Sequence, residues 1–279
     1  MSRQRLTVTM DKEVLRQVDR VIDGMRIRNR SHAIEYLLQK GFAPKVSQAL
    51  ILAGGKGLHM RPFTYEIPKC MLPVSGRPLL EHVIDLFRRY EIRDIIISVG
   101  YLGDKVKDHF GNGSKFGVRI QYIDQQKAEV GTTLPVKQAR RYLTDRSFIL
   151  YYGDVLADIN LRDLIDFHLS NRGLATMALT SVEKSSDWGV VALQGTKILN
   201  FAEKPVSNEV FSHLINAGIY VLEQGVYDYL SDQDKKLEDA VFSKLAKEGK
   251  LFGYAFDGKW FDVGTPDIYE RALKEWKGI

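Results

Sequence analysis

Between residues 48 and 169, short apolar runs alternate with segments whose apolar residues recur at helical spacing, and this alternation limits the fold more than any other feature. The successive pairs are Ala49–Ala53 with Leu79–Tyr90, Ile95–Val99 with Asp104–Phe110, Val118–Ile123 with Val136–Leu143, and Phe148–Tyr152 with Leu161–Leu169. Strands that alternate with helices in this way form a mostly parallel sheet with helices on both faces. We therefore predict an α/β domain over residues 48–279.

The pattern becomes less regular after about residue 175. Shorter strands are predicted at Thr176–Val182, Val190–Leu193 and Ala217–Leu222, and a helix at Leu237–Lys247 interrupts them. The predicted sheet is therefore mixed, although still mostly parallel.

The composition excludes several classes of protein. No apolar stretch approaches the roughly 18–20 residues that a membrane span needs, and the first ten residues lack the apolar region of a secretory signal. Cys70 is the only cysteine, so the chain cannot form an internal disulfide. These features predict an intracellular, cytoplasmic protein with no membrane partner.

A glycine cluster follows the first apolar run. Leu52 and Ala53 lead into Gly54, Gly55 and, after one lysine, Gly57. In an open parallel sheet, ligands bind beyond the carboxyl ends of the strands. Glycines at that position let backbone N–H groups approach phosphate oxygens, but a cluster of this kind is equally consistent with a tight turn.

A longer string distinguishes these alternatives. Residues 52–64 and 68–74, which contain Arg61-Pro62-Phe63-Thr64 and Pro68-Lys69-Cys70-Met71-Leu72-Pro73, resemble the signature of sugar-1-phosphate nucleotidylyltransferases. Further blocks of that family resemble, in order, Gly131-Thr132-Thr133, Tyr152-Gly153-Asp154, Trp188-Gly189-Val190-Val191, Glu203-Lys204-Pro205, Asn216-Ala217-Gly218-Ile219-Tyr220 and Trp260-Phe261-Asp262-Val263-Gly264-Thr265-Pro266. The resemblance covers about the last 230 residues and implies a Rossmann-like fold.

The resemblance implies a reaction in which a sugar 1-phosphate attacks the α-phosphorus of a nucleoside triphosphate and pyrophosphate leaves. It places Asp154 and Asp262 together as ligands of Mg²⁺, which prefers oxygen donors. It gives Lys69 the role of a cation on the sugar phosphate or the α-phosphate. The attacking oxygen is already an anion, so positioning and charge stabilisation are the main requirements.

The resemblance also implies two sets of binding residues. The nucleotide would contact Leu52, Ala53, Gly54, Gly55, Gly57, Gln126, Gly131 and Thr132. The sugar phosphate would contact Gly189, Glu203, Lys204 and Asn216.

The glycine loop departs from the family pattern at one position. The family has Gly-Thr-Arg-Leu-Arg-Pro, whereas this chain has Gly57-Leu58-His59-Met60-Arg61-Pro62. Arg61 is therefore retained as a predicted catalytic residue, while His59 stands where an arginine would contact the triphosphate. Histidine cannot present a bidentate guanidinium group, so the activity could be slow, altered or lost.

The first 42 residues form a separate pattern and carry nine Lys/Arg against five Asp/Glu, which holds most of the net charge of +5. Residues 5–10 alternate as a strand, Asp11 and Ser31 are predicted to cap two helices, and Gly24 and Gly41 to end them. This β-α-α unit resembles ribbon-helix-helix repressors, in which two chains pair their first strands in the major groove of DNA.

The ribbon-helix-helix resemblance implies the DNA-contacting residues. Arg5, Thr7 and Thr9 would face the bases, and Arg30 and Ser31 a phosphate. The alternate residues Leu6, Val8 and Met10 would face a partner chain. We therefore predict domains at 1–42 and 48–279 joined by a linker at 43–47, and a homodimer or a higher even homo-oligomer.

Three interpretations follow. The first is a transferase that also binds double-stranded DNA and regulates transcription. The second is a regulator whose transferase domain has lost turnover and senses a nucleotide or nucleotide sugar. The third is an enzyme whose N-terminal unit only makes dimers.

Overall fold

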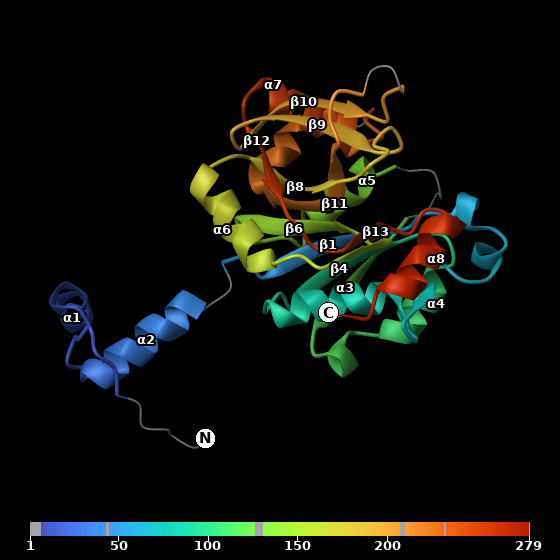
Figure 1. Cartoon of the computed structure of the whole chain (residues 1–279). Coiled ribbons are helices and arrows are strands. Elements are labelled where there is room, and N and C mark those ends of the chain that lie inside the picture. Colours follow the sequence, from blue (N-terminus) through green and yellow to red (C-terminus); the bar gives the residue numbers. More distant parts are fainter. Residues whose placement is uncertain (1–6, 43–44, 126–130, 207–209, 232, 279) are drawn as a thin grey trace. The chain divides into compact units, whose positions relative to one another are not determined.

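The computed structural model describes residues 7–42, 45–125, 131–206, 210–231 and 233–278, with no account of side chains 39–42 (Figure 1). The chain divides into two compact units, Met1–Lys45 and Val46–Ile279. Within the described residues, no helix is both long and apolar enough to cross a membrane.

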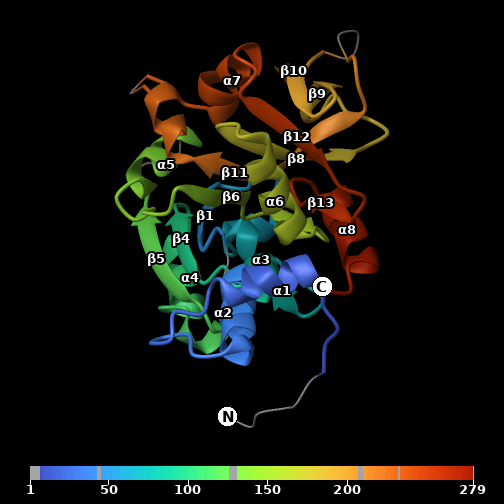
Figure 2. The same ribbon diagram turned by 90° about the vertical axis from the view of Figure 1, so that its left-hand side faces the viewer.

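A large mixed sheet forms the centre of the second unit, with the strand order β5-β4-β1-β6-β11-β8-β12-β10-β9. Figure 2 shows the strands following one another in this order from β5 to β12. Their bounds are Arg119–Asp124 (β5), Asp94–Val99 (β4), Gln48–Ala53 (β1), Ser147–Tyr152 (β6), Leu214–Glu223 (β11), Ala175–Ser181 (β8), Leu251–Ala255 (β12), Lys197–Glu203 (β10) and Gly189–Gln194 (β9).

The prediction of a mostly parallel sheet is correct for the half formed by β5, β4, β1 and β6, whereas the other half is mixed, with β8 and β12 parallel and its remaining pairs antiparallel. β5, β4, β1 and β6 pair in parallel, as their alternation with helices requires. By contrast, β11 is antiparallel to β6 and β8, and β10 is antiparallel to β12 and β9. The physical reason is visible between β9 and β10, where Gly195 at φ 58° reverses the chain in a tight turn without a helix.

The sheet separates two hydrophobic cores, one on each face, and strand β1 contributes to both. Ala49, Ile51 and Ala53 pack into one buried cluster, while Leu50 packs into the other, because successive side chains point to opposite faces. The first cluster is covered by α3, α4 and α6, and the second by α5 and α7 (Figure 1). The helix bounds are Leu79–Arg89 (α3), Gly103–Phe110 (α4), Thr133–Ala139 (α5), Leu161–Asn171 (α6), Ser243–Lys247 (α7) and Pro266–Glu275 (α8), with a π-helical segment at Glu238–Phe242 directly before α7.

Several elements were absent from the sequence predictions. Three of them, β10, β12 and α8, complete the second half of the unit. Four others are short strands, which pair as Pro73–Val74 (β2) with Arg77–Pro78 (β3) and as Val155–Ala157 (β7) with Trp260–Asp262 (β13). The 3₁₀ helices are Leu58–Met60, Phe63–Tyr65, Lys69–Met71, Ser114–Phe116 and Gln224–Tyr229. Segments of two or three residues are too short to show a period, so hydrophobic patterning does not detect them.

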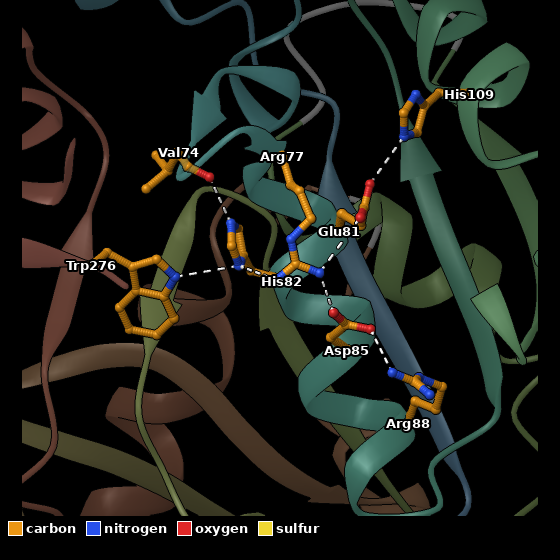
Figure 3. Close-up of polar contacts among 8 residues, drawn as sticks. All are labelled: Val74, Arg77, Glu81, His82, Asp85, Arg88, His109 and Trp276. Atoms are coloured by element: carbon orange, nitrogen blue, oxygen red, sulfur yellow. Dashed lines mark hydrogen bonds and ion pairs between the residues drawn. The ribbon is translucent and has the colours of Figure 1, made fainter. Parts of the chain in front are cut away.

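The buried residue His82 forms hydrogen bonds to both Trp276, near the end of the chain, and Val74, in the segment that follows Lys69 (Figure 3). The Nε2 atom of His82 lies 2.9 Å from the carbonyl oxygen of Val74, and the indole Nε1 of Trp276 donates to its Nδ1 at 3.3 Å. Burial lowers the pKa of His82, although the Val74 carbonyl acts in the opposite direction. The neutral ring therefore joins α3, the β2–β3 hairpin and the residues after α8.

The N-terminal unit contains two helices, Lys12–Asp19 (α1) and Arg30–Phe42 (α2). Asp11 caps α1 as predicted, because its side chain accepts a hydrogen bond from the N–H of Glu13. Ser31 does not cap α2; instead Asn29 Oδ1 accepts from the N–H of His32 at 2.9 Å, and the helix begins at Arg30. The helix also continues past Gly41 to Phe42, where the sequence predicted its end.

The predicted first strand is not formed in the part that the structure describes. Residues 7–10 have no strand structure, whereas Arg5 and Leu6 lie outside the described residues. An isolated strand cannot satisfy its backbone N–H and C=O groups by itself. In the predicted arrangement, the hydrogen-bond partners of these backbone groups belong to the same strand of a second chain. The structure contains one chain and therefore lacks these partners.

Candidate active site

Two adjoining clefts open at the carboxyl ends of β1 and β6. The first cleft is lined by Leu52, Ala53, Gly54, Gly55, Lys69, Cys70, Gln125, Gly131, Thr132, Tyr152, Gly153 and Asp154. The second cleft is lined by Tyr152, Val155, Trp188, Gly189, Glu203, Lys204, Asn216, Ala217, Gly218, Glu238, Trp260 and Asp262. Tyr152 belongs to both, so the two clefts meet at the end of β6.

Lys69, Asp154 and Asp262 lie together at this meeting point. The ammonium group of Lys69 forms an ion pair with the carboxylate of Asp154. Asp154 follows β6 and Asp262 ends β13, which pairs with β7 directly after Asp154; the N–H of Val263 donates to the Asp154 carbonyl at 3.0 Å. The β7–β13 pairing therefore brings together two residues that are far apart in the sequence.

The charges of these three groups influence one another. Burial lowers the pKa of Lys69, but the carboxylates of Asp154 and Asp262 outweigh this effect, so its pKa is raised and the ammonium form is favoured. Burial raises the pKa of Asp262, and the negative charge of Asp154 raises it further. The two aspartates are therefore close enough to repel each other.

The two carboxylates fit a divalent cation that also binds a ligand. Within the described ranges, no group of three His, Cys, Asp or Glu residues could hold a metal ion. Mg²⁺ commonly takes only one or two protein carboxylates and completes its shell with phosphate oxygens and water. A cation held by Asp154 and Asp262 would remove the repulsion that raises the pKa of Asp262.

Two of the glycines in the first cleft lie close to other groups. A Cβ atom on Gly54 would lie 2.5 Å from the side chain of Gln125. Gly131 has φ 69°, and a Cβ there would lie 2.0 Å from the Lys235 carbonyl oxygen, to which the N–H of Thr132 donates at 2.9 Å. A larger residue at Gly54 would displace the end of the Gln125 side chain, whereas at Gly131 it would collide with backbone, so glycine is required at Gly131.

A chain of buried polar side chains crosses the second cleft. Asn216 Nδ2 donates to the Tyr220 hydroxyl at 2.7 Å, and the Tyr152 hydroxyl donates to Glu238 at 2.6 Å. Burial raises the pKa of Glu203 to about 7, with Glu238 adding to the rise and Lys204 opposing it. Two carboxylates thus face one small polar cleft.

Two tryptophans form the wall beside Asp262. The indole Nε1 of Trp188 donates to Asp262 Oδ2 at 3.0 Å, and that of Trp260 donates to the Ala217 carbonyl at 2.9 Å. Their rings meet edge to face with centroids 5.7 Å apart.

Some of the predicted residues do not join this group. His59, on the 3₁₀ segment after the glycine loop, and Arg61, directly after that segment, are exposed, and neither lines either of these two clefts. The Arg61 guanidinium instead lies over the Tyr65 ring, 4.9 Å from its centroid. Gly57, at φ 61°, packs against Thr64, and Gln126 lies outside the described residues.

The clefts also contain residues that were not predicted as site residues. Gln125 directly precedes the predicted Gln126, and its position just beyond β5 was a usable signal, since residues beyond parallel strands reach the ligand edge. Glu238, Trp188 and Trp260 come from the less regular second half of the chain. No spacing rule connects them with β6, so sequence patterning did not find them.

A comparison with protein families matches residues 48–277 to the family described as nucleotidyl transferase. A UTP–glucose-1-phosphate uridylyltransferase of Synechocystis is 34% identical over 243 residues, and a mannose-1-phosphate guanyltransferase beta-B of Xenopus laevis is 32% identical over 232 residues. Each match covers 81% of this chain, and the chain spans only 62% and 63% of those two relatives.

Two further matches cover almost the whole of the other protein. A Bacillus subtilis protein assigned as a glucose-1-phosphate cytidylyltransferase is 33% identical over 82% of this chain and 96% of its own length. A Bacillus anthracis protein assigned as a glucose-1-phosphate thymidylyltransferase, solved with sucrose, has a TM-score of 0.75 and 27% identity over 83% of this chain and 96% of its own.

The raised pKa of Glu203 predicts a pH-dependent cost to stability. The pKa of Glu203 is about 7 in the folded protein, compared with the ordinary value of 4.5 that applies to the unfolded chain. The folded protein therefore binds this proton more tightly. Its stability falls as the pH rises through 7, because the proton is then lost. Glu203→Gln removes the ionisation. We expect this variant to raise the Tm relative to the unchanged protein, and by more at about pH 8 than at about pH 5.

Thermal unfolding at both pH values measures this difference. Glu183→Gln, which changes an exposed glutamate, is the matched control and should shift the Tm equally at both pH values. An equal gain for Glu203→Gln at the two pH values would show that the carboxyl group titrates normally.

Proposed function

The chain belongs to the nucleotidyl transferase family, and we propose from this premise that its second unit transfers a nucleotidyl group from a nucleoside triphosphate to a sugar 1-phosphate. The observation that carries the proposal is the cluster of Lys69, Asp154 and Asp262 where the two clefts meet. The named relatives differ in the base that they transfer, so the proposal extends to the reaction class and leaves the base open.

The first cleft suits the triphosphate. Its wall around Gly54, Gly55 and Gly131 is backbone, which offers N–H groups to phosphate oxygens without interference from side chains. Leu52 and Thr132 line the same space, where the nucleoside would lie.

The second cleft suits the sugar 1-phosphate. Glu203 and Asn216 offer oxygen and amide groups to sugar hydroxyls, and Lys204 offers a positive charge to the phosphate. Gly189 has no side chain, and a Cβ there would lie 2.7 Å from the Phe201 ring, so a larger residue would crowd this wall.

The reaction joins the contents of the two clefts. A phosphate oxygen of the sugar attacks the α-phosphorus, and the bond to the β-phosphate breaks, so that pyrophosphate leaves with the electron pair. The ammonium group of Lys69, largely buried and kept charged by the two aspartates, reduces repulsion between the two anions and stabilises charge on the phosphorus. Asp154 and Asp262 would hold Mg²⁺, which supplies further positive charge to the phosphates when it is bound.

Pyrophosphate release tests the proposed reaction. The unchanged protein should release pyrophosphate with Mg²⁺ and at least one pair in a panel of the common nucleoside triphosphates and sugar 1-phosphates. Lys69→Ala and Asp154→Asn each remove a charge from the cluster, and we expect the rate to fall by roughly 100-fold or more. Lys115→Ala, a change to an exposed lysine, is the control. Equal rates for Lys69→Ala and the control would contradict the proposal.

A second prediction concerns the glycine loop. A missing preorganised cation costs roughly 2.7–4 kcal/mol of transition-state stabilisation, or about 100- to 1000-fold in rate. His59 stands where the resemblance expects an arginine, so we expect His59→Arg to raise kcat for pyrophosphate release. An unchanged or lower kcat would show that position 59 does not limit the reaction.

For the N-terminal unit, we propose a role in binding double-stranded DNA as a dimer. Thr7, Thr9 and Ser31 are exposed, and residues 1–42 carry a surplus of positive charge. The small core leaves Val8 and Met25 exposed by 57% and 82%, which supports burial against a second copy. Arg30 forms a two-point ion pair with Asp19 at 2.7 and 2.9 Å, so a phosphate would have to compete for it.

Two alternatives remain tied to specific observations. His59 favours a regulator that binds a nucleotide or nucleotide sugar without turnover and changes its DNA affinity. The exposed apolar residues of the N-terminal unit also suit a module that only makes dimers.

A mobility-shift measurement separates these roles. We expect the full chain to retard DNA from upstream of its own coding region, with an affinity that falls steeply as salt rises, because phosphate contacts release counterions. A chain that begins at Val46 should lose the retardation and keep its pyrophosphate release, since the two units have separate cores. A dimer without retardation at low salt would favour the dimerisation module.

A further inference from the structure

We propose that Trp188 is a positioning residue that orients the Asp262 carboxylate for a divalent cation and links this carboxylate to Lys204, the residue directly after β10. The inference rests on the metal site of the proposed function. It gives a role to Trp188, which the resemblance includes only as part of a family block, without a role.

The side chain of Trp188 makes a specific contact with the carboxylate. Its indole Nε1 donates to Asp262 Oδ2 at 3.0 Å, and among the described residues it is the one hydrogen-bond donor to this carboxylate. An indole N–H can only donate, so it favours the ionised form of its partner, which is the form that binds a metal.

The backbone of Trp188 is fixed on its other side. Its N–H donates to the Ser185 carbonyl at 3.1 Å, and its own carbonyl accepts from the N–H of Lys204 at 3.2 Å. The Ser185 hydroxyl in turn donates to the Ser212 carbonyl at 2.9 Å. Trp188 therefore connects Asp262, through its side chain, with the proposed sugar-phosphate residue Lys204, through its main chain.

Close packing alone does not hold the Trp188 ring. One side of the residue lines the second cleft, and it also lines a separate cavity that includes Thr180, Ile268 and Arg271. The edge contact with Trp260 and the hydrogen bond to Asp262 are specific contacts that orient the ring beside these two spaces. Loss of the hydrogen bond would leave the carboxylate free to rotate.

Trp188→Phe tests this role, because phenylalanine keeps a ring and removes the N–H. Partners that orient metal ligands typically account for 10- to 100-fold in metal affinity, so we expect the Kd for Mn²⁺ alone, measured by electron paramagnetic resonance, to rise by about 10-fold or more. Trp276→Phe is the matched control, since it removes an indole N–H that donates to His82 and lines neither of the two clefts. Its Mn²⁺ affinity should be unchanged.

The aspartate variants separate this inference from the proposed function. If Asp154→Asn and Asp262→Asn both leave Mn²⁺ binding unchanged, the metal site itself is wrong, and the inference fails with it. If they weaken binding while Trp188→Phe does not, the metal site stands and the role of Trp188 is refuted.

A measurement on the unchanged protein makes the test independent of folding of the variant. The chain has three tryptophans and therefore three indole N–H resonances in a ¹⁵N-edited spectrum. Mg²⁺ should shift the Trp188 resonance, whose acceptor is Asp262, and should leave that of Trp276, which is buried against His82, in place. A Trp188 resonance that does not move at saturating Mg²⁺ would overturn the inference.

Discussion

The ion pair between Lys69 and Asp154, with Asp262 beside it, is the interaction on which the rest of the site depends. Burying a lone ammonium or carboxylate group is costly, and mutual attraction offsets that cost only when the partners are close. Two strand pairings make them close: β1 with β6 sets the floor of the first cleft, and β7 with β13 brings Asp262 to Asp154. The cluster is therefore a product of two strand pairings, one in the large sheet and one in the separate two-stranded sheet β7–β13.

The second cleft holds two carboxyl groups whose closeness is unfavourable in the free protein. Glu203 and Glu238 share a small buried space, and the pKa of Glu203 is raised to about 7 as a result of burial first and of Glu238 second. A core selected for stability alone would not place two carboxyl groups there. In the proposed function, the hydroxyl groups of a sugar would donate to these carboxylates, and the cost in the free protein would then contribute to specificity.

Much of the first half of the second unit was predictable from patterning. The strands at 48–53, 94–99 and 147–152 each agree with the predicted strand within one residue, because continuous apolar runs bounded by turns are typical of buried parallel strands. The second half was harder: β10 and β12 were missed, and the sheet direction changes there. In β10, the polar residues Lys197, Asn200 and Glu203 leave apolar runs of two residues each, and the strand is recognised by its partners.

The sequence by itself determined the family, the alternation that builds the parallel half of the sheet, and the residue types of the predicted site, because these depend on order and local pattern. The tertiary structure decided which of those residues meet. It brought Asp262 to Asp154 and Lys69, placed Trp188 on Asp262, and left His59 and Arg61 exposed outside the clefts. Contacts of this kind arise from strand pairing across about a hundred residues, and no local propensity encodes them.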